Sequence, residues 1–168
     1  MIKQLRVLLV GSMCGLLLIA SSARGEGKAV DWKALQAAKV SLEKGLGAAQ
    51  QKGKPISAKF EVEDGKIQLS TYTAKNGKFS EVVVDHSSGK IAKSEVIKEG
   101  DDYKDATEQS QAMAKATKSL RTAVAKAVAE NRGYLAVSAI PSLKEGKPVA
   151  TVVLQNASGT KSAVEKLD

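Results

Sequence analysis

Apolar and polar residues alternate along several short runs of this chain, and a period of two predicts strands that bury one face. The first run extends from Ile56 to Val62 and is followed by Asp64-Gly65 and Asn76-Gly77. These dipeptides favour two-residue hairpin turns, because both of their residues accept positive φ. A further strand is predicted from Ile91 to Ile97. A second set of alternating positions predicts a similar antiparallel sheet, whose buried face starts with Val137, Ala139, Pro141 and Leu143.

A period of three to four residues precedes each set of strands and predicts helices with one apolar face. The first helical stretch has Asp31 as its predicted N-cap and ends near Gly53. Gly45 and Gly47 lie within it, and they either break the helix or let it pack closely on the sheet. The apolar face comprises Leu35, Ala38, Leu42, Leu46 and Ala49.

The second helical stretch is predicted as one long helix from Asp102 to Asn131, bent near Ser119, with Gly133 just past its end. It enters the second set of strands without a loop, so the two sheets are expected to hold a fixed relation. One side of this helix is apolar and the other is basic. The apolar set is Ala106, Met113, Leu120, Val124 and Ala127, and the basic set is Lys104, Lys115, Lys118 and Lys126.

The two sets of elements match at nearly constant spacing, which indicates an internal repeat. Ser119-Leu120 follows Ser41-Leu42 by 78 residues, and the first strands match at an offset of 81. The predicted fold is therefore α+β, with two tandem units that are joined by the long helix. Each unit is a helix packed on an antiparallel sheet of three to four strands. Residues 24–99 form the first unit, and residues 100–168 form the linking helix and the second unit.

The start of the chain has the pattern of a secretory signal peptide over residues 1–23. Lys3 and Arg6 precede an apolar stretch from Val7 to Ala20, and small residues up to Ala23 offer a cleavage site. Whether the signal is cleaved or retained as an anchor stays open. The exported chain is expected in the periplasm or outside the cell. It would contain no cysteine, so its stability would come from packing without disulfides.

The chain carries a net charge of +8, which falls to +6 over residues 24–168 because Lys3 and Arg6 belong to the predicted signal. A basic protein in the envelope favours acidic partners or anionic surfaces. Export and scattered aromatic residues argue against nucleic acid. With one histidine, His86, and no cysteine after residue 23, the chain offers no set of nucleophile, acid and base. We therefore expect no enzyme, no cofactor and no metal site.

These motifs resemble the PepSY family, small modules of exported bacterial proteins and peptidase propeptides. The valine-rich strand that ends in Asp85, followed by Gly89-Lys90, is the most specific match. The resemblance implies a helix on an antiparallel sheet, an extracytoplasmic location and a role in binding or inhibiting peptidases. The tandem arrangement is also similar in architecture to secreted beta-lactamase inhibitory proteins. The other matching motifs are Ser41-Leu42-Glu43-Lys44, Gly47-Ala48-Ala49, Phe60-Glu61-Val62 and Asp64-Gly65-Lys66, with Ser119-Leu120, Ala127, Gly146-Lys147 and Leu167-Asp168 in the second copy.

The leading hypothesis is a non-catalytic module that binds another extracytoplasmic protein, such as a peptidase that it regulates or inhibits. The alternative is an electrostatic module that binds acidic polymers or lipid headgroups through the basic side of the second helix. A protein partner is expected on the sheet face away from the helices, with Tyr72 as an exposed anchor. The partner's identity, contact with a membrane surface and the oligomeric state stay open. The candidate residues on that face are Ser57, Lys59, Glu61, Gln68, Ser70 and Tyr72.

Overall fold

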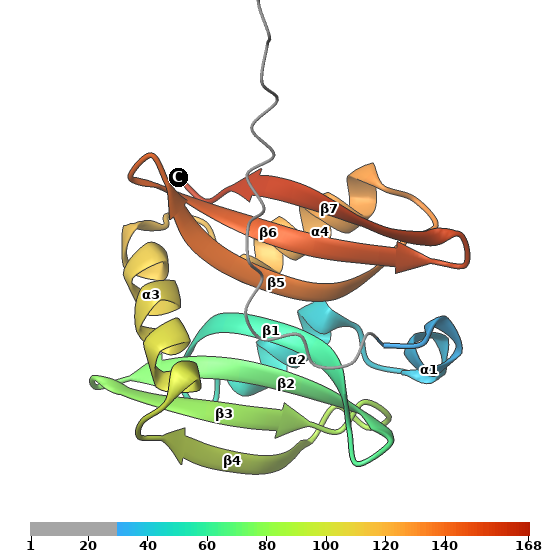
Figure 1. Ribbon diagram of the computed structural model, residues 1–168, viewed down its shortest axis with the longest axis horizontal. Helices are drawn as coiled ribbons and strands as arrows, with labels where there is room; N and C mark the ends of the chain where they lie inside the picture. The colour runs from blue at the N-terminus through green and yellow to red at the C-terminus, as the bar shows by residue number, and fades with distance from the viewer. Residues whose placement is uncertain (1–29) are drawn as a thin grey trace, which may run out of the picture.

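The computed structural model describes residues 30–168, so the predicted signal segment lies outside the described residues. Over these residues the chain forms one sheet of seven strands in the order β4-β3-β2-β1-β5-β6-β7, together with four helices (Figure 1). The predicted α+β class is confirmed. The strands are β1 (Lys54–Glu63), β2 (Lys66–Lys75), β3 (Lys78–Val84), β4 (Ile91–Ile97), β5 (Leu135–Lys144), β6 (Lys147–Asn156) and β7 (Gly159–Lys166), and the helices are α1 (Trp32–Ala37), α2 (Leu42–Ala49), α3 (Asp101–Lys115) and α4 (Leu120–Glu130).

Three tight turns set the register of the hairpins. The φ angles are 49° and 75° at Asp64-Gly65, 52° and 72° at Asn76-Gly77, and 51° and 77° at Glu145-Gly146. Positive φ at both central residues is the backbone of a type I′ turn, whose twist matches that of the flanking strands. The turns predicted at Asp64-Gly65 and Asn76-Gly77 are confirmed, and β4 covers the predicted residues Ile91–Ile97.

Each predicted helical stretch is divided into two helices by a short extended segment. Asp31 caps α1 as predicted, because its Oδ2 accepts from the Lys33 N–H at 3.1 Å. Ser41 and Ser119 cap α2 and α4, and their Oγ atoms accept from backbone N–H groups at 3.3 Å and 3.1 Å. The prediction of one continuous helix from 102 to 131 is wrong, because α3 ends at Lys115 and α4 begins at Leu120.

Hydrogen bonds to distant carbonyl groups hold these extended segments. The N–H groups of Thr117 and Lys118 donate to the Leu167 carbonyl at 2.8 and 2.9 Å. In the first half, the N–H groups of Lys39 and Val40 donate to the His86 carbonyl at 2.9 and 3.0 Å. These long-range bonds, together with a serine that caps the next helix, replace the helical ladder that a continuous helix would form.

Two helices cover one side of the sheet: α2 packs on β1, β2 and β3, and α4 packs on β5, β6 and β7. All five apolar residues predicted for the second helical stretch are buried, and all four lysines of its basic set are exposed. Residues that pair across the strands share one face of the sheet. The face that bears Phe60, Leu69 and Val152 is called the helix face. The face that bears Lys59, Tyr72 and Val153 is called the opposite face.

Gly45 lets α2 approach the sheet closely. A Cβ atom at position 45 would lie 2.5 Å from Leu69 Cδ2, whereas a Cβ atom at Gly47 would lie 3.7 Å from Arg121 Nη1. The helix continues through both glycines from Leu42 to Ala49. Of the two alternatives that the sequence leaves open, close packing is therefore the one that the structure shows.

The two halves of the sheet meet at a short junction between β1 and β5. These strands pair only at Ala58 with Ala139 and at Lys59 with Ser138, and each carries a bulge next to this point. The bulge between Ala136 and Ser138 also shifts the alternation in β5. Ala136 is therefore buried, at 7% exposure, and Val137, predicted to be buried, is only half-buried. Leu143 lies on the helix face, as predicted, but it is 40% exposed near the end of the strand.

Candidate binding surface

The six candidate residues predicted for a partner lie together on the opposite face of β1 and β2. Cross-strand pairing sets Lys59 beside Ser70 and Glu61 beside Gln68. Lys59 Nζ lies 2.7 Å from Glu61 Oε2, and Gln68 Nε2 donates to Ser70 Oγ at 2.9 Å. Ser70 Oγ in turn donates to Glu81 Oε1 at 2.8 Å. Sequence analysis missed Glu81, whose place in β3 beside Tyr72 follows only from the pairing of the third strand.

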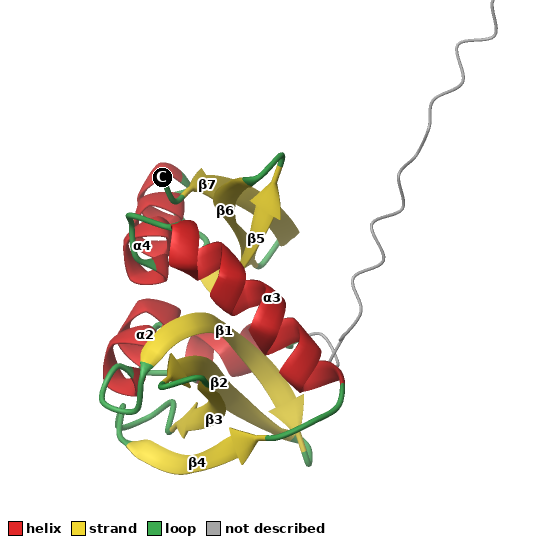
Figure 2. Cartoon of the chain, turned by 90° about the vertical axis from the view of Figure 1, so that its left-hand side faces the viewer, coloured by secondary structure: helices red, strands yellow, loops and turns green. Residues whose placement is uncertain are grey.

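The expectation that this part of the face is exposed is wrong, because α3 crosses onto it (Figure 2). Ser57 and Ser70 are buried, and Tyr72 is half-buried. Ser57 Oγ donates to Gln109 of α3 at 2.6 Å. The rings of Phe79 in β3 and Tyr103 in α3 pack edge to face, with centroids 5.3 Å apart. Sequence analysis placed every helix over a single face, whereas α3 supplies a second layer on the opposite face.

Tyr72 therefore belongs to a small polar pocket below α3 and is not an exposed anchor. The pocket encloses about 80 Å³, and Asp102 and Asp105 reach it from α3. Burial raises the pKa of the Tyr72 phenol above its ordinary value, and the nearby carboxylates of Glu81 and Glu61 raise it further. Lys59 Nζ lies 5.7 Å from the centre of the Tyr72 ring. Tyr72 is thus a neutral, packed phenol.

The second half of the opposite face has a different character. The helix α3 also packs on β5 and β6, and Ile140 lines the pocket below it, but apolar side chains stay exposed on this half. Ile140 in β5, Thr151 in β6 and Val164 in β7 form one cross-strand row. Ile140 is 44% exposed and Val164 is 57% exposed. Val149 and Val153 flank this row on β6 and are half-buried. The signal for this face was the run from Val149 to Leu154, in which apolar residues occupy both alternating sets of positions.

Three lysines lie on the same face, to one side of this apolar row along the strands. Lys144 and Lys147 stand directly opposite each other beside the β5–β6 turn, and Lys166 pairs with Val149. All three are exposed, and over residues 30–168 no carboxylate lies within 4.0 Å of them. We call Ile140, Val149, Thr151, Val153 and Val164, with Lys144, Lys147 and Lys166, the β5–β7 surface.

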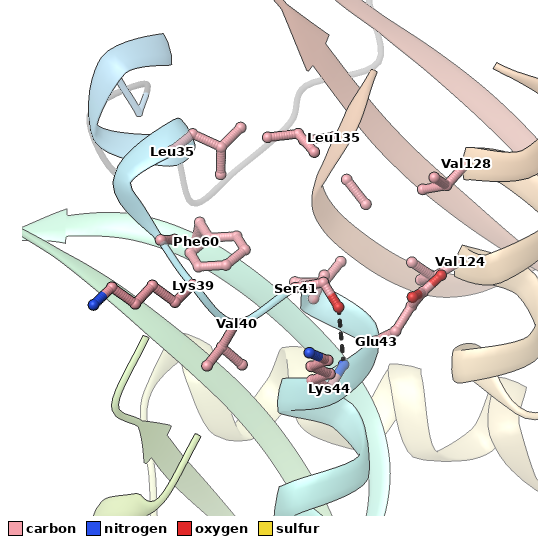
Figure 3. A pocket seen from close by; sticks show the side chains of 13 residues that line it. Leu35, Lys39, Val40, Ser41, Glu43, Lys44, Phe60, Val124, Val128 and Leu135 are labelled. Carbon is pink, nitrogen blue, oxygen red and sulfur yellow. Dashed lines mark hydrogen bonds between the residues drawn. The ribbon is translucent and has the colours of Figure 1, made fainter. Parts of the chain in front are cut away.

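A pocket of about 210 Å³ lies on the helix side, between the start of α2 and the end of α4 (Figure 3). Leu35, Phe60 and Leu135 line its apolar part, and the side chain of Ser41 caps α2 at its edge. The charged residues that line it are of both signs, so its electrostatics select no class of ligand. These charged residues are Lys39, Glu43 and Lys44.

The segment Asp85-His86-Ser87, which contains the one histidine, forms a turn. Asp85 Oδ1 accepts from the N–H of Ser87 at 3.2 Å and from the N–H and Oγ of Ser88, both at 2.6 Å. The bonds from Ser88 lower the pKa of the Asp85 carboxyl. Among residues 30–168, no group of three or more His, Cys, Asp or Glu side chains could hold a metal ion. In the same part of the chain, every helix is too short or too polar to cross a membrane.

The comparisons with known proteins found little. No family model matches this chain, and no curated protein matches it. Among solved structures, it is similar to the crystal structure of a "putative lipoprotein" from Clostridium difficile 630, with a TM-score of 0.45 and 9% sequence identity over 80% of this chain and 91% of that chain. A likeness below a TM-score of 0.5 carries no conclusion for this chain, and the PepSY resemblance stays a prediction.

Proposed function

We propose that this chain is an exported, non-catalytic module that binds another extracytoplasmic protein through its β5–β7 surface. The observation that carries the proposal is the exposed apolar row, in which Ile140 and Val164 are 44% and 57% exposed. Contiguous exposed apolar side chains with a polar rim mark interaction sites on soluble proteins. A sheet face without a deep pocket or convergent polar groups suits a protein better than a small molecule.

The charges beside the apolar row define the partner's chemistry. Lys144 and Lys147 are cross-strand neighbours, and like charges placed directly opposite destabilise a sheet. A partner that supplies carboxylates would relieve this repulsion and gain charge-assisted hydrogen bonds. The partner surface is therefore an apolar patch flanked by acidic residues. A secreted peptidase that this module regulates or inhibits is the specific form that the PepSY resemblance implies.

We further propose that the two halves are copies of one unit related by a two-fold axis at the junction. β1 and β5 begin 81 residues apart, at Lys54 and Leu135, and both contain ten residues. Ala58 and Ala139 are 81 residues apart and pair with each other, as equivalent residues do across a two-fold axis. Two pockets of about 210 Å³ also correspond: Leu35 and Val124 line one, and Met113 and Leu46, offset by 78, line the other.

The alternative function, electrostatic binding through the basic side of the second helical stretch, has less support. Lys126 Nζ lies 2.6 Å from the carboxylate of the buried Glu165 and also contacts Glu130. Lys115 and Lys118 donate to the carbonyl groups of Gly146 and Asp168. Three of the four lysines of the basic set are thus engaged within the chain, whereas those of the β5–β7 surface have no carboxylate beside them among residues 30–168.

Affinity capture from the protein's own envelope fraction, compared among variants, tests the proposal. Val164→Asp places a charge at the β7 end of the apolar row, on its most exposed side chain, and should reduce capture of the partner at least about tenfold. The matched control is Leu143→Asp, because Leu143 is 40% exposed on the helix face of the same sheet half. The control should capture the same partner as the unaltered protein.

Capture at low and at raised salt separates the two functions. A packed protein interface should keep most of its partner when the salt is raised, while electrostatic binding should weaken steeply. If Val164→Asp keeps the partner and a Lys115→Ala/Lys118→Ala variant loses it, the proposed surface is wrong and the electrostatic function replaces it.

A further inference from the structure

The sheet ends in two strands that have a neighbour on one side only, β4 and β7, and β4 is the more open of them (Figure 1). Its central residues, Ala92 to Val96, are all exposed, and Val96 is 53% exposed. The helix α2 reaches only as far as β3, so β4 lies beyond its cover. An edge strand presents unpaired N–H and C=O groups, which can pair with another strand.

The sequence of β4 is complementary to itself. Antiparallel pairing of two copies about Ser94 sets Lys93 of each copy opposite Glu95 of the other. The same register sets Ala92 opposite Val96 and Ile91 opposite Ile97. Opposite charges and apolar pairs stabilise neighbouring strands when they stand directly opposite each other. Every cross-strand pair in this arrangement is therefore favourable or neutral.

The side chains that would make these contacts are exposed, and the ion pair that Lys93 and Glu95 form with each other would exchange for pairs between the two copies. Lys93 and Glu95 are each 59% exposed, and their Nζ and Oε2 atoms lie 2.9 Å apart along the same edge. On the other side of the strand, Val96 would cover Ala92 of the second copy and lose solvent exposure. The irregular register at Val83/Val84, beside Ala92, limits regular pairing to the residues around Ser94.

The other edge lacks this complementarity. Pairing of two β7 strands about Ala163 and Val164 would set Lys161 opposite Lys166, two like charges. Glu165 is 5% exposed and bonded to Lys126, so its carboxylate is committed within the chain. Self-association of this protein through a sheet edge would thus use β4.

We propose that this protein forms a two-fold dimer by antiparallel pairing of β4 with β4 of a second copy. The short pairing of β1 with β5, which holds the two halves together, shows the same antiparallel contact between strands inside one chain. A single strand pair buries less than the roughly 1,200 Å² of a standard protein interface. The dimer is accordingly weak and depends on concentration. It leaves the β5–β7 surface at the far edge of each copy.

The experiment is sedimentation velocity of the exported protein over a range of concentrations, with charge variants. In the proposed dimer, position 93 of each copy stands opposite position 95 of the other. Both of these pairs join two carboxylates in a dimer of the Lys93→Glu variant, and both join two ammonium groups in a dimer of the Glu95→Lys variant. Each variant alone should therefore stay monomeric where the unaltered protein dimerises. A mixture of the two variants restores both opposite-charge pairs and should dimerise again. The matched control, Lys161→Glu on β7, should dimerise like the unaltered protein, and circular dichroism checks that each variant is folded.

Rescue in the mixture is the decisive result, because misfolding of a variant cannot produce it. A protein that stays monomeric up to about millimolar concentration overturns the proposal. A dimer that persists in both single variants, or one that the Lys161→Glu control abolishes, also overturns it and places the contact elsewhere.

Discussion

Replacing Phe60 tests the predicted phase of β1 and the packing of the helix face. Phe60 is 5% exposed, stands opposite the fully buried Leu69, and lines the pocket between α2 and α4 (Figure 3). Emptying a core aromatic position costs about 3–5 kcal/mol of unfolding free energy. The existing pocket of about 210 Å³ opens to solvent beside this ring. Water can therefore enter the new space, which places Phe60→Ala near the lower end, about 3 kcal/mol.

The matched variant is Lys59→Ala at the neighbouring position on the opposite face. The Lys59 and Glu61 side chains are 29% and 12% exposed and lie 2.7 Å apart at their charged groups. A partly exposed ion pair of this kind contributes about 0.2–1 kcal/mol. Urea unfolding followed by circular dichroism gives both values from the shift in midpoint at constant slope. Equal, small losses in the two variants would refute the reasoning, since they would mean that Phe60 does not fill the core.

Two further predictions rest on single contacts. Gly45→Ala should destabilise the fold by about 1 kcal/mol, because the new Cβ displaces the buried Leu69 and this outweighs the better helix propensity. Gly47→Ala should stabilise it by about 0.5–1 kcal/mol, since its Cβ would meet only Arg121, with Nη1 at 3.7 Å. Thermal unfolding of both variants checks the opposite signs. Burial raises the pKa of Tyr72, so the folded state keeps the phenol proton that the unfolded state loses above about pH 10, and stability should fall as the pH rises beyond that value. Tyr72→Phe should reduce this alkaline loss in urea unfolding at about pH 8 and about pH 11, and an unchanged loss would show that Tyr72 does not contribute.

Local signals in the sequence predicted most of the elements. The Asp64-Gly65 and Asn76-Gly77 turns adopt positive φ, and β4 occupies the predicted residues. The breaks in the helical stretches were not predictable from periodicity. The apolar stripe continues through positions 116–119, while the break depends on a bond to the Leu167 carbonyl from Thr117, 50 residues away. The sequence offers Ser119 as an N-cap, but the same pattern also fits a bend in one continuous helix.

The candidate surface shows a similar limit. Alternation correctly predicted that Lys59, Ser70 and Tyr72 share one face of the sheet. It could not show that α3 packs on that face, because the contacts of Tyr103 and Gln109 are made across long separations in the chain. The alternation predicted for β5 leaves Ile140 on the free face, but the row that it forms with Thr151 and Val164 was missed because it follows only from the pairing of β5, β6 and β7.

Photo-crosslinking from defined positions in the envelope tests the central claim, a protein partner on the β5–β7 surface, most directly. A photoreactive residue in place of Thr151 lies between Ile140 and Val164 in the apolar row. A photoreactive residue in place of the exposed Arg121 in α4 serves as the control on the helix side. We predict a crosslink to one extracytoplasmic protein from position 151 that is absent from position 121. A partner that crosslinks from position 121 and not from position 151 would contradict the account.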